Sequence, residues 1–552
     1  MEGPASASTD LHAEYAVAER RIALLRRSPQ VFAHPVGRIE CIETHISWVL
    51  LAGDFAYKFK KPLQLDFLDF STAALRRAAC EEELRINRRT APAMYLGLVG
   101  LHHEVAAEAL WFTPLCDAAQ DAEPAVQMRR FGQEALFGTA LDLQKVLPVQ
   151  VDLLARHVAQ FHASAAIAAP GLGWGTAPAV RAPVDACLTA LRDVVAMALP
   201  AQAPLLDQVA AWFRQQGDAL APVFEDRLTH GRVRECHGDL HLANIALIDG
   251  HPQLFDAIEF NPALRWIDGV ADIAFVVMDL TAHGRSDLAW RFVNLWLEYT
   301  GDYHGLRVLR YYCAYRALVR ARVAGMQWVP RGDAGSGGAA VRTLQQYLAL
   351  AAEYAGLFAG GLPTIPNASL WMAHGFSGAG KSTHTLSLAC QRGMVRVRAD
   401  VERKRLFGLL PEAQSDAVPG GIYTPDATRR TRDRLAQVAC DALSAGLSVI
   451  VDATFLDSEA RSHFVGLAGR LGVPCRILSF EAPLEILRDR VRGRSAAGGD
   501  ASEASVAVLD AQWASASPLL AAEELITLHV DTTRPVDWDV LLPRVGASPV
   551  GP

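Results

Sequence analysis

The sequence lacks the patterns that mark disulfide-rich, zinc-binding, secreted and membrane-spanning proteins. Its nine cysteines stand singly, with no CxxC pair and no cluster with histidine, as is usual for reduced thiols in a cytosol. The N-terminal segment contains neither a basic nor an apolar stretch, so we expect no secretory signal. No uninterrupted apolar run approaches the roughly 18 residues that span a membrane. These absences favour a cytoplasmic protein without a membrane partner.

An excess of positive charge is also missing. The chain has 53 lysines and arginines against 60 aspartates and glutamates, so it offers no broad basic field for long nucleic acid. Hydrophobic residues make up 51% of the chain and charged residues 20%, a composition typical of a globular protein rather than a disordered one. No internal repeat relates the two halves, and 552 residues are too many for a single hydrophobic core.

Glycine and proline divide the chain at residues 360–366, and a new strand–loop–helix pattern begins directly after them. We therefore predict a first domain over 1–358, a linker over 359–368 and a second domain over 369–545. Strand patterns alternate with helical patterns in the second domain, which predicts an α/β fold with a parallel sheet and helices on both faces. The expected strands are 370–374, 395–398, 448–452, 475–480 and 526–530.

A complete phosphate-binding motif follows the first of these strands. Residues 375–382 read Gly-Phe-Ser-Gly-Ala-Gly-Lys-Ser and satisfy G-x-x-x-x-G-K-[ST], the Walker A motif, between an apolar strand and a helical pattern. Backbone N–H groups of such a loop surround phosphate oxygens, and the helix N-terminus favours an anion. Lys381 is expected to reach the β and γ phosphates and Ser382 to hold Mg²⁺. The predicted nucleotide contacts are Gly375, Ser377, Gly378, Ala379, Gly380, Lys381, Ser382 and Thr383.

Two aspartates end strands at the edge where the P-loop is expected, which is where open α/β sheets place their ligands. Asp452 suits a magnesium ligand, either direct or through water. Asp400 suits a general base that takes the proton of an acceptor hydroxyl, although a helix N-cap explains it equally well. Arg490 and Arg494 lie four residues apart before a segment of small residues, which fits a lid over the phosphates. The alternative for these arginines is an exposed basic helix face.

These residues resemble the P-loop kinases grouped with polynucleotide kinase, zeta toxin and gluconate kinase. The resemblance covers about 369–535 and depends on the P-loop, the Asp400-x-x-Arg403 pair, the Asp-Ala-Thr at 452–454 and the two lid arginines. It implies that Asp400 activates the acceptor hydroxyl and that Arg403 helps to bind the acceptor. It does not identify the acceptor, because members of this group phosphorylate very different molecules.

The first domain contains a kinase catalytic-loop motif. Residues 237–244 read His-Gly-Asp-Leu-His-Leu-Ala-Asn, which matches H-x-D-x-x-x-x-N with glycine where protein kinases have arginine. This form is found in aminoglycoside phosphotransferases and choline kinases, and residues 35–355 resemble that superfamily. The resemblance implies an α+β bilobal protein-kinase-like fold. It also implies a proton-accepting Asp239, a metal-binding Asn244, and an Asp272 that anchors the catalytic loop.

The next segment gives an independent geometric expectation. Asp249-Gly250 is a tight-turn signal between two apolar runs. Folding a hairpin at that turn brings Asn244 within one or two positions of Asp256, so two oxygen ligands for a metal converge. Asp256 is then the counterpart of the aspartate in the kinase Asp-Phe-Gly motif, although Ala257-Ile258 replaces its last two residues.

Upstream, a second predicted hairpin turns at Gly53-Asp54, and Lys58 on its second strand is the expected phosphate-binding lysine. Lys60 and Lys61 are alternatives. Its partner is expected on a helix over 71–90, where three glutamates are consecutive and Glu83 is favoured over its neighbours Glu81 and Glu82. No G-x-G-x-x-G loop precedes the lysine, as in many relatives of the aminoglycoside kinases.

Together these motifs predict an ATP- and Mg²⁺-dependent phosphotransferase with two sites that act on hydroxyl groups of small molecules. Two alternatives remain open. In one, a single half is catalytic and the other is a nucleotide-binding regulatory module. In the other, the C-terminal half is a nucleic-acid 5′-hydroxyl kinase, which the Asp-x-x-Arg pair supports and the acidic charge balance opposes. The fold leaves acceptor, nucleotide preference and oligomeric state open.

Overall fold

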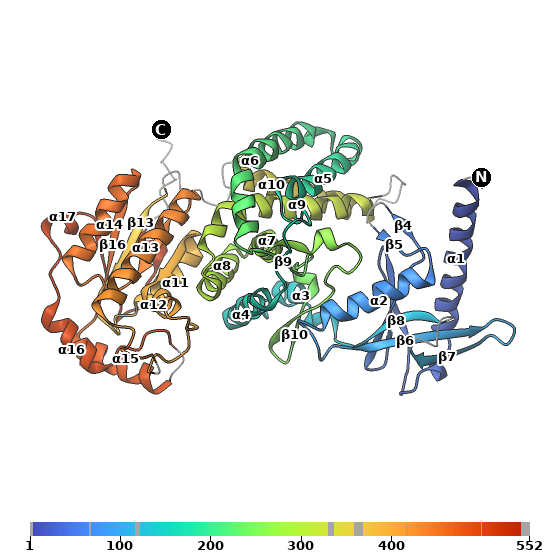
Figure 1. Cartoon of the computed structure of the whole chain (residues 1–552), viewed down its shortest axis with the longest axis horizontal. Coiled ribbons are helices and arrows are strands. Elements are labelled where there is room, and N and C mark those ends of the chain that lie inside the picture. Colours follow the sequence, from blue (N-terminus) through green and yellow to red (C-terminus); the bar gives the residue numbers. More distant parts are fainter. Residues whose placement is uncertain are drawn as a thin grey trace. The chain divides into compact units, whose positions relative to one another are not determined.

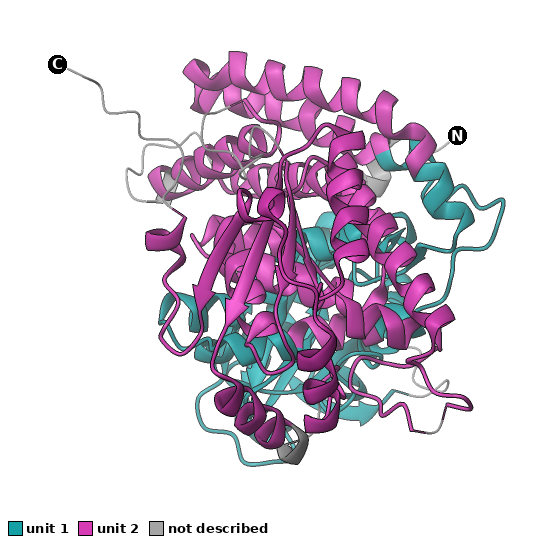
Figure 2. Cartoon of the chain, turned by 90° about the vertical axis from the view of Figure 1, so that its left-hand side faces the viewer, with its two compact units in different colours: residues 1–153, 161–180, 224–276 teal, residues 154–160, 181–223, 277–552 magenta. Residues whose placement is uncertain are grey.

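The computed structural model describes residues 4–65, 68–115, 122–328, 336–357, 368–416, 418–497 and 500–542. It forms two compact units, drawn in teal and magenta in Figure 2. Unit 1 contains residues 1–153, 161–180 and 224–276, and unit 2 contains residues 154–160, 181–223 and 277–552. Nearly all of the predicted linker, 359–368, lies outside the described residues, so the domain boundaries placed there stay predictions.

Unit 1 contains an antiparallel sheet in the order β1-β2-β3-β8-β6-β7. Its strands are β1 (Glu40–Glu43), β2 (Ser47–Ala52), β3 (Phe55–Lys60), β6 (Tyr95–Glu104), β7 (Ala109–Pro114) and β8 (Glu123–Arg129). Because side chains alternate along a strand, Leu50 packs in one apolar cluster with Ile22 of helix α1 (Pro4–Leu25), whereas Leu51 packs in another with Cys80 of helix α2 (Ala73–Asn87). The predicted hairpin at Gly53-Asp54 joins β2 to β3.

The catalytic-loop motif of unit 1 lies between β9 (Val233–Glu235), which pairs with β12 (Trp266–Asp268), and the hairpin of β10 (Ile245–Ile248) and β11 (His251–Leu254). Asp249 and Gly250 have φ of 50° and 79°, as a two-residue hairpin turn requires, so the hairpin predicted at Asp249-Gly250 is also confirmed. A short ribbon of β4 (Gln64–Leu65) and β5 (Leu68–Asp69) precedes α2. An antiparallel sheet with one long helix, followed by this loop, is the protein-kinase-like part of the chain.

Helices dominate the remainder of the first predicted domain, and some of them cross from one unit to the other. They are α3 (Phe137–Asp142), α4 (Pro148–Ser164), α5 (Ala177–Ala198), α6 (Ala203–Thr229), α7 (Gly269–Ala282), α8 (Ser286–Thr300), α9 (Leu306–Gln327) and α10 (Ser336–Tyr354). Within unit 2, α9 packs on α10. In the part of the chain that the structure describes, no helix is both long and apolar enough for a membrane span.

The second sheet lies in unit 2 and has the order β14-β15-β13-β16-β17 with every pair parallel. Its strands are β13 (Leu370–His374), β14 (Val395–Arg398), β15 (Val449–Asp452), β16 (Cys475–Glu481) and β17 (Thr527–Asp531), so all five predicted strands are confirmed. The helices of this part are α11 (Lys381–Arg392), α12 (Ala399–Leu406), α13 (Pro425–Ser444), α14 (Ser458–Leu471), α15 (Leu484–Ala497), α16 (Val506–Ser515), α17 (Ala521–Glu524) and α18 (Trp538–Leu541), and Figure 1 labels α11 to α17. This α/β P-loop part completes the predicted fold class.

Candidate active sites

The first site begins with a buried lysine–glutamate pair. Lys58 on β3 places Nζ 2.9 Å from Oε1 of Glu83 on α2, and the same ammonium contacts the carboxylate of Asp256. The Glu83 side chain is fully buried. The two preceding glutamates point elsewhere, since Glu81 pairs with Arg77 and Glu82 pairs with Arg85 on the surface of the helix. Among the three consecutive glutamates, Glu83 is therefore the one that contacts the lysine.

A second buried lysine joins this cluster. Lys60 Nζ lies 2.5 Å from Glu83 Oε2 and also contacts Glu259, whereas Lys61 turns away to Glu43 at 2.6 Å. Burial alone would raise the pKa of Glu83, but Lys58 and Lys60 outweigh it and lower that pKa to about 2. Burial likewise opposes charge on Lys58, yet its carboxylate partners raise its pKa well above the ordinary value. Glu83 and Lys58 are therefore both ionised at neutral pH, whereas burial raises the pKa of Glu259.

The loop of the H-x-D-x-x-x-x-N motif places its two predicted site residues in contact. Asn244 Nδ2 donates to the backbone oxygen of Asp239 at 2.9 Å and to its Oδ2 at 3.1 Å. The Asp239 side chain is 34% exposed, so its carboxylate is accessible from solvent. His241 Nε2 lies 3.4 Å from Asp239 Oδ2.

The β10–β11 hairpin brings the metal-ligand candidates together as its turn predicted. Ile245 faces Leu254, and the N–H of Phe255 donates to the carbonyl of Asn244 at 3.0 Å, so Asp256 is one position beyond Asn244 across the ladder. Asp256 has φ of 62°, and its side chain is 43% exposed. Non-glycine residues held at positive φ cluster at functional sites. Its N–H donates to Tyr95 Oη at 3.0 Å, which fixes this backbone.

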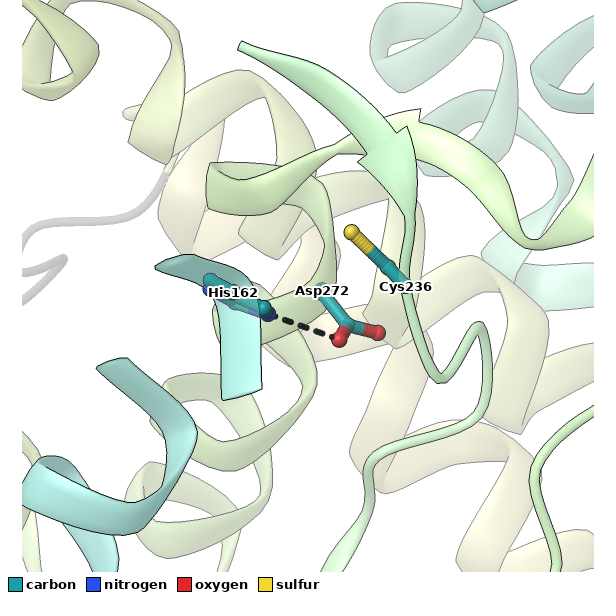
Figure 3. A group of neighbouring side chains, drawn as sticks. All are labelled: His162, Cys236 and Asp272. Atoms are coloured by element: carbon teal, nitrogen blue, oxygen red, sulfur yellow. Dashed lines mark hydrogen bonds and ion pairs between the residues drawn. The ribbon is translucent and has the colours of Figure 1, made fainter. Parts of the chain in front are cut away.

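A fully buried aspartate holds the start of the catalytic loop. Asp272 accepts hydrogen bonds from the backbone N–H groups of His237 at 3.1 Å and Gly238 at 2.8 Å, and His162 Nε2 lies 3.0 Å from its Oδ2 (Figure 3). Burial would raise the pKa of Asp272, but these partners lower it. This is the anchoring geometry that the resemblance implied.

Cys236 lies beside the same pair, and one ligand atom each of Cys236, His162 and Asp272 are within 4.8 Å of one another (Figure 3). Burial raises the pKa of the Cys236 thiol well above its usual range, and its Sγ lies 3.5 Å from the carbonyl of Ile267. A metal ion would need the thiolate and would have to displace donors from Asp272. The trio is therefore a packed anchor for the loop rather than a metal centre.

The second site is built on the loop between β13 and α11. Gly375 has φ of 140°, and a Cβ there would lie 2.6 Å from the carbonyl of Phe480 on β16, so only glycine fits. Lys381 folds back over its own loop, where Nζ donates to the carbonyls of Gly375 at 2.9 Å and Phe376 at 2.8 Å. Burial lowers the pKa of Lys381 to about 8, against the opposing effect of Asp452 and Asp400.

The predicted carboxylates lie at the same edge of the sheet as this loop. In the parallel register Asp452 pairs with Ala373 and with Arg398, so β13, β14 and β15 end side by side. Asp452 is buried and its Oδ2 accepts from Thr385 Oγ1 at 3.3 Å, while Asp400 lies in the first turn of α12 directly after β14.

The three predicted arginines have different surroundings. Arg490 donates to Thr532 Oγ1 at 3.0 Å and to the P-loop carbonyl of Gly378 at 3.4 Å, which places it against the loop. Arg494 donates to the carbonyl of Ala504 at 3.0 Å. Arg403 is held by the carbonyl of Ile422 at 3.2 Å, and its guanidinium lies 5.1 Å from the ring centre of Tyr423, whose ring is half exposed.

Several residues beside the P-loop were not anticipated from the sequence. Arg398 Nε lies 3.9 Å from Asp452 Oδ2, and Gln512 Oε1 accepts from the N–H of Ser377 at 3.0 Å. Trp513 lies against Phe376 with ring centres 4.7 Å apart. Arg398 is the last residue of β14, two residues before Asp400, so its position near the site could have been predicted from the sequence. Gln512 and Trp513 come from α16, and no local pattern linked that helix to the loop.

The fold and this geometry define the second part as a P-loop nucleotide-binding domain attached to a kinase-like part. Residues 370–519 match the family model of an AAA domain (AAA_33). The uncharacterized proteins Rv2004c of Mycobacterium tuberculosis (strain ATCC 25618 / H37Rv) and Mb2027c of Mycobacterium bovis are each 28% identical to the chain over 489 residues, which is 87% of this chain and 92% of theirs. The similarity thus extends across both parts.

Several solved structures are similar to parts of the chain. An ethanolamine kinase of Plasmodium vivax aligns with a TM-score of 0.35 and 11% identity, over 59% of this chain and 86% of its own. The amicoumacin kinase hAmiN aligns with a TM-score of 0.37 and 10% identity, over 61% and 96%. A gluconokinase from Sinorhizobium meliloti 1021 aligns with a TM-score of 0.22 and 18% identity, over 31% and 85%.

Proposed function

We propose that the protein is an ATP-dependent phosphotransferase with two phosphoryl-transfer sites, each acting on hydroxyl groups of small molecules. The observation that carries the proposal is the charged cluster of Lys58, Glu83 and Asp256 beside the loop of Asp239 and Asn244. Phosphoryl transfer needs little covalent chemistry from the protein, and it depends on positioned cations, metal ligands and a base. Each part of the chain supplies such a set.

In the first site, Asp239 accepts the proton of the acceptor hydroxyl, and Asn244 holds that carboxylate in place. When ATP binds, the Lys58 ammonium leaves Asp256 and contacts the phosphates, while Glu83 keeps the ammonium in position. Carboxylate and amide oxygens are the donors that Mg²⁺ prefers, so Asn244 and Asp256 fit this ion. When bound, it would neutralise charge on the phosphate oxygens.

In the second site, Lys381 exchanges the carbonyls of its own loop for phosphate oxygens. Ser382 and Asp452 have the donor chemistry for Mg²⁺, and Asp400 takes the acceptor proton. Arg490 adds positive charge beside the loop, and Arg494 follows it on the same helix. The free state of all eight described cysteines fits a reducing cytoplasm, where ATP is available.

The nucleic-acid alternative has one specific observation in its favour. Tyr423, an exposed aromatic ring beside Arg403, is the kind of pair on which a base stacks next to a backbone phosphate. In this alternative the C-terminal half is a 5′-hydroxyl kinase.

The regulatory alternative keeps one site catalytic and uses the other only to bind nucleotide.

A metabolite pool supplied with γ-labelled ATP tests these functions. Wild type should label two kinds of acceptor, D239A should lose one of them by about 10²- to 10⁴-fold, and K381A should lose the other. If one variant abolishes all transfer and the other changes none, the regulatory alternative is correct. Labelling of a 5′-hydroxyl oligonucleotide that disappears in D400A supports the nucleic-acid alternative. An absence of any labelled acceptor refutes the proposal.

A further inference from the structure

Helix α8 lies outside residues 370–519 but packs against α11 and β14 of the P-loop part within unit 2 (Figure 1). Asn294 and Glu298 are four residues apart on α8, so they share one helix face. Both are buried, with 0% and 3% of their surface exposed. A buried amide and a buried carboxylate on a contact face need specific partners, because burying them without hydrogen bonds is costly.

Asn294 binds the backbone of β14. Its Nδ2 donates to the carbonyl of Met394 at 3.0 Å, and its Oδ1 accepts from the N–H of Arg396 at 2.6 Å. β14 is the edge strand of the sheet, so among the described residues no strand pairs with these backbone groups on that side. The amide therefore fixes the strand that leads directly into Asp400.

Glu298 holds two arginine side chains of the same strand. It contacts Arg396 through Oε1, and its Oε2 lies 3.7 Å from Arg398 Nη1. Arg396 Nη1 donates to the carbonyl of Ser382 at 2.7 Å, in the first turn after the P-loop. Arg398 reaches Asp452 at 3.9 Å and Asp500 at 2.9 Å. One carboxylate thus touches both arginines that approach Ser382 and Asp452.

The charges around Arg398 give this contact a function. Its guanidinium is attracted by Glu298, Asp452, Asp500 and Asp400. When Glu298 loses its charge, Arg398 is drawn more strongly to Asp452, where it neutralises the carboxylate that a metal ion needs. Arg396 at the same time loses the partner that aims it at Ser382. Both changes weaken the binding of Mg²⁺ at Ser382 and Asp452.

We propose that Glu298 and Asn294 are positioning residues for the P-loop site. They act from a helix that precedes the AAA-domain match, with Glu298 keeping Asp452 available to Mg²⁺ through Arg398. The inference rests on the proposed nucleotide function of the P-loop. Residues 370–519, which match the AAA domain, therefore do not contain every residue that the P-loop site needs.

Hydrogen exchange with mass spectrometry tests this in the full chain, because protection of the P-loop peptide reports binding there separately from the first site. Wild type and E298Q are titrated with ATP in the presence of Mg²⁺ and with ATP in EDTA. E298Q should weaken Mg²⁺–ATP binding about tenfold, at the low end of losses caused by outer ligands of metal sites. Binding of ATP in EDTA should change less than about twofold, whereas simple structural damage would weaken both alike.

The matched control is E523Q. Glu523 is a buried carboxylate of unit 2 that pairs with Arg461 at 2.9 Å and lies at 5% exposure, similar to Glu298. E523Q should leave both affinities unchanged. In an R398Q background, the cation that E298Q turns toward Asp452 is absent. E298Q should therefore cause a smaller magnesium-selective loss there than in wild type, because residues that act through one another are not additive. If E298Q unfolds, E298D replaces it. Its shorter side chain withdraws the carboxylate from Arg398, so the same magnesium-selective loss is expected.

K381A separates this inference from the proposed function. If wild type gains no P-loop protection from Mg²⁺–ATP, or if K381A gains as much as wild type, the P-loop function itself is wrong. If K381A loses protection while E298Q behaves as E523Q does, the positioning role is wrong. The role is also wrong if E298Q, or E298D in its place, weakens binding equally with and without Mg²⁺.

Discussion

Replacing Glu83 by glutamine measures how much the two lysines depend on one buried carboxylate. Lowering the pKa of Glu83 from its ordinary 4.5 to about 2 corresponds to about 3 kcal/mol of stabilisation. Removing one partner of a buried ion pair has a similar cost, on the order of 3–5 kcal/mol. E83Q should therefore reduce the protection of β3 and α2 against hydrogen exchange at pH 7 by about 100-fold.

The pH dependence has a definite sign. Because the pKa of Glu83 is depressed in the folded protein, its stabilisation is present above about pH 4.5 and is lost as pH falls toward about 2. The difference between wild type and E83Q should shrink over that window, once intrinsic exchange rates are corrected. E81Q on the same helix is the control, since Glu81 is 52% exposed and its pair with Arg77 contributes at most about 1 kcal/mol. An effect of E83Q no larger than that of E81Q would refute the reasoning.

Two further predictions concern the P-loop and use the same peptide-resolved binding measurement. Because burial lowers the pKa of Lys381 to about 8, its positive charge is lost as pH rises through that value, and nucleotide affinity should fall up to about tenfold per pH unit above it. An affinity that is constant to about pH 9.5 contradicts this. G375A should abolish nucleotide binding, because the new Cβ meets the Phe480 carbonyl at 2.6 Å, whereas G408A, also at positive φ but in open space, should keep it. Equal binding by the two variants contradicts the steric explanation.

The sequence predicted the elements of both parts because their signals are local. Buried parallel strands such as β15 read as continuous apolar runs, and turn dipeptides such as Asp249-Gly250 fix a hairpin and its register. That register predicted Asn244 within one or two positions of Asp256, and the structure has it one position away. The positions of the P-loop, Asp400 and Asp452 could be predicted because the parallel strands that precede them end at one edge of the sheet.

Contacts between distant segments were beyond local signals. The three consecutive glutamates differ only in direction around α2, and packing decides that Glu83 is fully buried while Glu81 is half exposed. The contact between Lys60 and Glu259 could not be predicted from the sequence around Lys60, because Glu259 lies almost two hundred residues later. Helical spacing placed Arg490 and Arg494 on one face, but it could not show that Thr532 holds the first of them against the P-loop.

The amide of Asn294 also determines where the chain can be cut. A recombinant fragment that begins at residue 369 would leave the carbonyl of Met394 and the N–H of Arg396 without their partner. An uncovered edge strand is a template on which further chains assemble into aggregates. Work on the nucleotide-binding part in isolation should therefore retain α8 at its start.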